Sequence, residues 1–226
     1  MQSKLSKDGS IHVTDEKINT ISHLAAAIFS ILGAVLLIVQ SSAKANPWAI
    51  VSFSIYGVSL VGVFFASALH HGVNSNEPIE AFLRQIDYIA IFPLIAGTFT
   101  PICLILYRTI IGWSIFGVIW ALAGIGIAIK SVFPKVPKWV FGTMYISMGW
   151  IGVFLIIPVF EKAGIAGLIF LIGGAFFYSA GFTVFNVEKP NPMEGKFGFH
   201  EIWHILVIFG AIFHYFMMYF TILPLS

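Results

Sequence analysis

The chain has almost no cysteine and very little charge. Cys103, the one cysteine among 226 residues, lies inside an apolar run. A single thiol excludes an internal disulfide and any zinc cluster built from several cysteines, so a metal would have to be held by histidine and carboxylate side chains. Charged residues make up only 10% of the chain, and the net charge is +2. This balance gives no reason to expect a nucleic-acid partner.

Apolar residues are correspondingly abundant. Hydrophobic residues make up 58% of the chain and aromatic residues 16%, which lies far outside the usage of soluble proteins. The composition predicts an all-α, multi-pass membrane protein, which we expect in the cell (inner) membrane. The 21 glycines are compatible with close helix packing and with a homo-oligomer, but they do not define how many chains assemble.

The apolar runs predict a bundle of seven transmembrane helices. A span needs about 20 apolar residues, and runs of that length lie at 18–40, 48–71, 139–158, 165–185 and 199–223. The run at 86–129 is twice that length, and Tyr107-Arg108-Thr109 in its middle predicts a turn between two helices. The polar residues 1–17 are expected to form a tail without a cleavable signal peptide. Residues 18–226 then form the transmembrane domain.

The distribution of lysine and arginine predicts the orientation of this domain. One set of ends carries nine of them: Lys4, Lys7, Lys17, Arg84, Lys130, Lys135, Lys138, Lys189 and Lys196. The opposite set carries only Lys44, Arg108 and Lys162. Because positive residues accumulate on the cytoplasmic side, we expect the N-terminus to be cytoplasmic and the C-terminus to be outside.

Two histidines open the last apolar run. His200 and His204 are four residues apart, and on an α-helix this spacing places both imidazoles on one face, about 6 Å apart along the axis. Zinc needs at least one further protein ligand. His214 is about 21 Å from His200 along such a helix, which is too far for it to join the site.

Other polar residues are expected at the same end of the bundle. Facing lipid costs an ionisable side chain several kcal/mol, so we expect these residues to form one cluster inside the bundle near the cytosolic surface. They are Glu16, Asn19 and His23 on the first span, Ser67, His70 and His71 on the second, Asp87 on the third, and His200, Glu201 and His204 on the seventh.

Four motifs in this order resemble the hemolysin III branch of the progestin and adipoQ receptor family, along nearly the whole chain. They are Glu16-x-x-Asn19-x-x-x-His23, Ser67-x-x-x-His71, the stretches LRQIDY at 83–88 and AGTFTP at 96–101, and GFHEIWH at 198–204. The resemblance implies seven helices, an internal N-terminus and a zinc ion near the cytosolic leaflet. By motif, its ligands would be His71, His200 and His204, with Asp87 and Ser67 close by.

One position departs from the family pattern. His70 stands where the family more often has an aromatic residue, so two adjacent histidines compete as the third ligand. Only His71 keeps the four-residue spacing from Ser67.

A zinc held by three imidazoles indicates hydrolytic chemistry. The ion keeps its double charge, and its fourth position can take a water whose pKa falls to around 7. Asp87 could accept a proton from that water, and Ser67 could orient the site or stabilise an oxyanion. The depth of the site and the resemblance, which extends to ceramidases, together predict hydrolysis of a membrane lipid at an amide or ester bond.

Three other functions are compatible with the same residues. The zinc could be structural, in a non-enzymatic receptor-type protein. The family name also implies a membrane-disrupting or pore-forming hemolysin, although a pore needs polar residues along the full bilayer depth. Finally, His200-Glu201-x-x-His204 matches the H-E-x-x-H pattern of metalloproteases, but residue 210 is glycine where an extended pattern of that class has its third histidine. For Glu16, Asn19 and His23, capping of the first helix competes with a role in the site.

Overall fold

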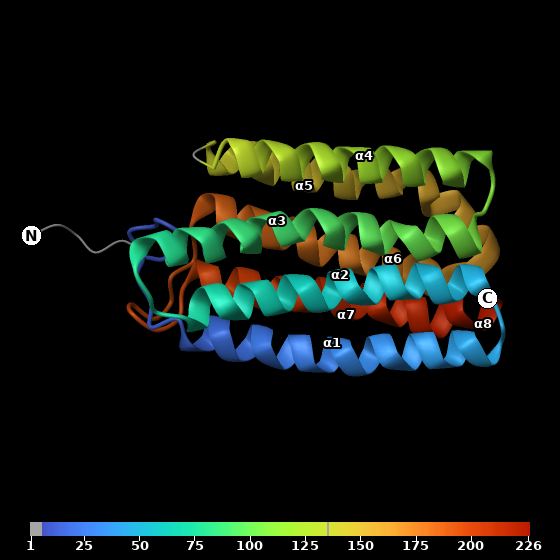
Figure 1. The fold of residues 1–226 in the computed structure, drawn as a ribbon, viewed down its shortest axis with the longest axis horizontal. Helices are drawn as coiled ribbons and strands as arrows, with labels where there is room; N and C mark the ends of the chain where they lie inside the picture. Colours follow the sequence, from blue (N-terminus) through green and yellow to red (C-terminus); the bar gives the residue numbers. More distant parts are fainter. Residues whose placement is uncertain (1–5, 135) are drawn as a thin grey trace, which may run out of the picture.

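The protein is a helical bundle in a computed structural model that describes residues 6–134 and 136–226 (Figure 1). Lys4 and Lys135, which contribute to the charge asymmetry above, lie outside these ranges. The described α-helices are α1 (Lys17–Ala43), α2 (Pro47–Gly72), α3 (Glu77–Pro101), α4 (Ile110–Val132), α5 (Lys138–Trp150), α6 (Ile156–Val187), α7 (Phe199–Met217) and α8 (Leu223–Leu225). Short π- or 3-10-helical segments extend three of them: η1 (Ile102–Leu106), η2 (Ile151–Leu155) and η3 (Met218–Ile222).

Six helical segments among the described residues are long and apolar enough to cross a membrane. They are Lys17–Ala43, Pro47–Gly72, Glu77–Leu106, Ile110–Val132, Lys138–Val187 and Phe199–Leu225. The chain is therefore a multi-pass membrane protein. The sequence predicts seven spans, and the count differs because the two runs expected at 139–158 and 165–185 fall within one helical segment, Lys138–Val187, which is kinked at Gly164.

The connection between α2 and α3 is shorter than expected. The sequence predicts a loop up to residue 85, but α3 begins at Glu77, where the side-chain oxygen of Asn76 accepts a hydrogen bond from the amide of Ile79 at 3.2 Å. Hydropathy detects only the apolar part of a helix, so it misses a polar first turn. Asp87 consequently lies ten residues into α3 instead of near its start. The turn expected at Tyr107-Arg108-Thr109 is confirmed.

Helix packing brings three distant parts of the chain to one end of the bundle. α1 packs against α2 and α7, and α7 packs against α6. Figure 1 shows the first described residues, the end of α2 and the start of α7 at one end, with the C-terminus at the other. Between these ends the core consists of apolar side chains such as Phe53, Tyr56 and Phe92. The side of the membrane that each end faces stays a prediction.

Candidate metal centre

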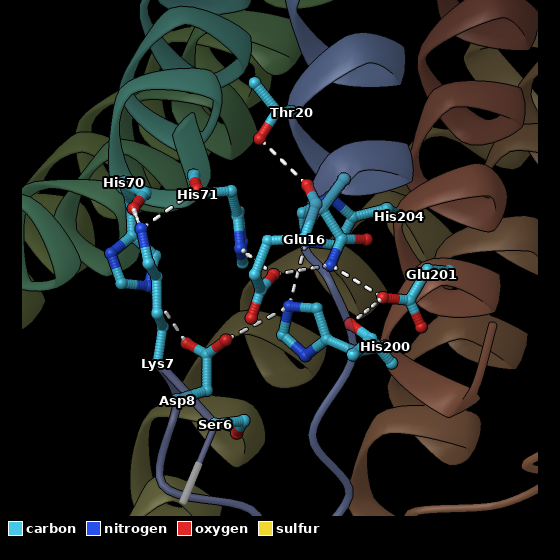
Figure 2. Close-up of polar contacts among 12 residues, drawn as sticks. Ser6, Lys7, Asp8, Glu16, Thr20, His70, His71, His200, Glu201 and His204 are labelled. Carbon is cyan, nitrogen blue, oxygen red and sulfur yellow. Dashed lines mark hydrogen bonds and ion pairs between the residues drawn. The ribbon is translucent and has the colours of Figure 1, made fainter. Parts of the chain in front are cut away.

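Three histidines from two helices converge at this end of the bundle. His71 ends α2, His200 and His204 lie in the first two turns of α7, and all three are buried. One potential ligand atom from each lies within 4.8 Å of the others, and the Nε2 atoms of His200 and His204 are 3.0 Å apart. Figure 2 shows His71 of α2 facing the start of α7, where His200 and His204 lie. The spacing on α7 thus produces the expected pair, and α2 supplies the third imidazole.

The arrangement around His71 fits a metal ligand. Its Nδ1 is 2.7 Å from Oε2 of Glu16, and its Nε2 is buried without a hydrogen-bond partner among the described residues. A histidine that binds a metal through one ring nitrogen usually donates a hydrogen bond from the other, often to a carboxylate. Three imidazole nitrogens suit zinc, although they also suit copper, iron and nickel. The residues therefore fit a bound metal ion, and its identity as zinc belongs to the proposal below.

The polar stripe on α1 contacts this group directly. The side-chain amide of Asn19 donates hydrogen bonds to Glu16 at 2.8 Å and to Glu201 at 2.9 Å. The ring of His23 stacks on that of His204 with centroids 3.9 Å apart and an interplanar angle of 27°. The stripe thus lies beside the three histidines, and Glu16 also precedes the first residue of α1.

Glu201 has both carboxylate oxygens engaged. Oε1 accepts hydrogen bonds from Thr14 at 2.6 Å and from Asn19, while Oε2 accepts one from the backbone amide of Gly198 at 2.8 Å. The side chain is fully buried. Glu201 therefore joins the N-terminal tail and α1 to the start of α7. The Gly198 amide, like the other amides at a helix start, has no hydrogen-bond partner within the helix, and Glu201 supplies one.

Asp87 and Ser67 are buried on α3 and α2. The Asp87 carboxyl interacts electrostatically with His71 and His70 and by hydrogen bonding with Ser67. Neither residue belongs to the three-histidine group, however. Both residues lie near His71, and their places in the site and their catalytic roles stay predictions.

The structure adds one residue that the sequence does not indicate. Asp8, in the N-terminal tail, is 6% exposed, with Oδ2 at 3.2 Å from Nε2 of His200 and Oδ1 at 3.4 Å from Nε2 of His70. Asp8, His70 and His71 form a second group whose potential ligand atoms lie within 4.8 Å of one another. No periodicity relates residue 8 to residues 70 or 200, so no sequence signal could have placed it here.

Asp8 and Glu16 are both held as carboxylates. Burial alone would raise the pKa of Asp8, but the charges of His200 and the hydrogen bond with His70 bring it well below its usual range. Burial likewise acts to raise the pKa of Glu16, and its hydrogen bond with His71 lowers it overall. Two negative side chains thus face the imidazoles, which favours a cation between them.

Comparison with known proteins places this geometry in a family. The family model described as "Haemolysin-III related" matches residues 11–215. The chain belongs to this family. It is 35% identical to "Hemolysin-3" of Bacillus cereus over 94% of each chain, and 33% identical to "Hemolysin-3 homolog" of Bacillus subtilis (strain 168) over 88% of this chain and 90% of the relative. A more distant relative is "Monocyte to macrophage differentiation factor" of Homo sapiens, 23% identical over 89% of this chain and 82% of the relative.

Proposed function

We propose that this haemolysin-III-related protein is a zinc-dependent, ceramidase-like hydrolase of lipid amide or ester bonds. The observation that carries the proposal is the convergence of His71, His200 and His204 at one buried point, with Glu16 hydrogen-bonded behind His71. Catalytic zinc sites have three protein ligands, which are three histidines in one class, and keep a fourth position open for water or substrate.

The residues around the three histidines have separable roles. The chemistry that a bound zinc supplies is polarisation of a carbonyl and acidification of a water molecule. Glu16 fixes the tautomer and orientation of His71, and His23 packs against the ring of His204. The carboxylate of Asp87 accepts the proton of the attacking water. The hydroxyl of Ser67 donates a hydrogen bond to the oxyanion that develops on the scissile carbonyl.

An apolar groove beside these residues supports a lipid substrate. The groove encloses about 580 Å³ and is lined mainly by α2 and α3, with Trp120 of α4. Ala66 and Ile86, which line it, directly precede Ser67 and Asp87 in the chain. Apolar side chains suit the hydrocarbon chain of a lipid, and the groove would hold that chain near the proposed catalytic groups.

The proposal includes seven spans, a cytoplasmic N-terminus and the inner cell membrane. As one straight helix, residues 138–187 would measure about 75 Å, whereas the hydrocarbon core is about 30 Å thick. Gly164 interrupts the segment with φ 63° and ψ −162°, which only glycine adopts readily. Residues 138–163 and 165–187 would then each reach about 35 Å or more. An odd number of crossings also agrees with the first described residues and the C-terminus lying at opposite ends of the bundle (Figure 1).

The hydrolase is tested with purified protein in vesicles that contain a ceramide, by measuring the fatty acid released and the zinc retained. We expect Asp87→Asn to keep its zinc and to lose about 100-fold or more in rate, because the amide cannot accept the proton. Asp15→Asn, at an exposed tail carboxylate paired only with Lys17, is the matched control. Full activity in Asp87→Asn would refute its role. Zinc-loaded wild-type protein that releases no fatty acid from amide- or ester-linked lipids would instead support a structural metal.

Membrane disruption is a second candidate, favoured by the name "Hemolysin-3" of the Bacillus cereus relative. A pore needs polar groups through the full bilayer depth, whereas the buried side chains in the middle of this bundle are mainly apolar. Vesicles loaded with dye separate the two functions. Dye efflux without fatty acid release would favour a pore, and fatty acid release from intact vesicles would favour the hydrolase.

A further inference from the structure

A short turn in the N-terminal tail covers the three-histidine group. The amide of Gly9 donates to the carbonyl of Ser6 at 2.9 Å, and the amide of Ser10 donates to the hydroxyl of Ser6 at 2.9 Å. Gly9 has φ 77°, a conformation that glycine adopts at no steric cost. The turn places Asp8 between His70 and His200, as Figure 2 shows. Its side chain is buried at a site where the sequence predicts only an exposed tail.

Lys7 fastens this turn to the end of α2. Its Nζ donates hydrogen bonds to the carbonyl oxygens of His70, His71 and Val73 at 3.1, 2.9 and 2.7 Å. The last carbonyls of a helix have no partner within the helix, and a cation is favoured there. Arg84 of α3 in turn donates to the carbonyl oxygen of Lys7 at 2.7 Å. The tail is therefore bound to both helices by charged side chains.

The Asp8 carboxylate lies at the edge of the three-histidine group, which does not itself include it, and within 4.8 Å of a ring nitrogen of His71. In a tetrahedral zinc site with bonds of about 2.0–2.1 Å, neighbouring ligand atoms are about 3.3 Å apart. The Nε2 of His200 lies 3.2 Å from Oδ2 of Asp8 and 3.0 Å from Nε2 of His204. Two of the six edges of such a tetrahedron are thus present, both at His200, and on metal binding the Asp8 carboxylate would have to move closer to the other ligands. The other oxygen of Asp8 faces His70 and the hydroxyl of Tyr88, at 3.4 and 3.3 Å, which orient the carboxylate.

We propose that Asp8 is the fourth protein ligand of the metal centre, so that the N-terminal tail closes the position that water or substrate must occupy. This inference rests on the metal site of the proposed function and adds its regulation. Exchange of ligands would then begin when the turn at residues 6–10 withdraws, which requires the contacts of Lys7 and Arg84 to break. In this arrangement His70 does not compete with His71 for the metal, and it positions Asp8 instead.

The test uses full-length protein loaded with Co²⁺ in place of zinc, because the visible spectrum of Co²⁺ reports its ligands. Azide is the probe for an accessible coordination position. We expect Asp8→Asn to bind azide about tenfold or more tightly than wild type, a difference of about 1.4 kcal/mol, because the carboxylate no longer competes with azide for the coordination position. Asp15→Asn, in the same tail but exposed and paired with Lys17, should behave like wild type.

Lys7→Gln is a second variant that leaves the carboxylate in place. This variant weakens the attachment of the N-terminal turn to α2. Its azide affinity should therefore lie between those of wild type and Asp8→Asn, while its Co²⁺ spectrum without azide remains that of wild type. Far-ultraviolet circular dichroism checks that all variants stay folded. Equal azide affinity in wild type and Asp8→Asn would overturn the role of Asp8 while leaving the metal site intact. Wild-type protein that takes up no Co²⁺ would overturn the proposed function itself, and the inference with it.

Discussion

Two histidines of α7 show how neighbours decide what a buried imidazole does. His204 and His214 are ten residues apart on the same helix, and both are buried. His214 faces α6, where its Nε2 lies 3.4 Å from the carbonyl oxygen of Leu171 and its ring lies against Gly174. His204 instead meets imidazoles from α1, α2 and its own helix. Burial alone gives a packed histidine, and only the convergence of several helices gives a possible metal centre.

The largest expected difference between His204 and His214 comes from replacing each of them by alanine. His204→Ala should lose about one equivalent of zinc on purification, because it removes one of the three imidazoles and leaves only His71, His200 and the carboxylate of the tail residue Asp8. His214→Ala should keep its zinc and lose about 1–3 kcal/mol of stability from the lost packing and hydrogen bond. Metal analysis and thermal unfolding of both purified variants measure these effects. Equal zinc content in the two variants would remove the distinction between the histidines.

Glu16→Gln is expected to weaken metal binding at the three-histidine group without removing one of its ligands. The amide can still reach Nδ1 of His71, but it loses the charge that favours the metal-bound imidazole. Zinc affinity, measured by competition with a chelator, should fall about 10–100-fold. Asp15→Asn is the control, one residue earlier in the chain and exposed. Unchanged affinity in Glu16→Gln would mean that the contact of 2.7 Å between Glu16 and His71 does not contribute to metal binding.

Gly174→Ala is expected to disturb the packing around His214 and to leave the three-histidine group unchanged. A methyl group at this position would overlap the ring of His214, so the ring or the helix has to move. Overpacking of this kind costs about 1–3 kcal/mol, which should appear as a lower unfolding temperature with full zinc content. Gly117 offers a matched control on α4, since an added methyl group there meets nothing within 4 Å. Zinc loss in Gly174→Ala would show that the two ends of α7 are coupled.

The smallest effect on activity and stability is expected for Glu201→Gln. Glu201 lies between the proposed ligands His200 and His204 in the chain. One side-chain oxygen remains to accept from Thr14 and Asn19, but the new amide group faces the Gly198 amide. Loss of such a helix-start hydrogen bond costs about 1 kcal/mol. Lipid hydrolysis should therefore stay within a few-fold of wild type. A variant that folds, binds zinc and has lost hydrolysis would make Glu201 a general base, as in the metalloprotease pattern.

The polar end of the bundle was largely predictable because its residues lie on regular helices. The four-residue spacing of His200 and His204 and the stripe of Glu16, Asn19 and His23 follow from 3.6 residues per turn, and the structure brings both sets together. Intramembrane ionisable residues also have few alternatives to facing one another. His71 is favoured over His70 by its four-residue spacing from Ser67, and the structure places His71 in the group with His200 and His204.

The features that the sequence missed depend on irregular backbone. Asp8 reaches the site through the turn at residues 6–10, which has no periodic pattern. α3 begins at Glu77 because Asn76 and a polar first turn start a helix outside the apolar run. Gly164 interrupts the helical segment over residues 138–187 with φ 63° and ψ −162°, and hydropathy does not register such backbone geometry.

X-ray absorption at the zinc edge of purified wild-type protein tests the central claim most directly. The account predicts about one zinc per chain with histidine nitrogens at about 2.0–2.1 Å and a carboxylate oxygen at about 2.0–2.2 Å. His71→Ala should remove the signal of the bound metal. A protein that carries no metal, or a zinc spectrum without the multiple-scattering pattern of imidazole, would contradict it.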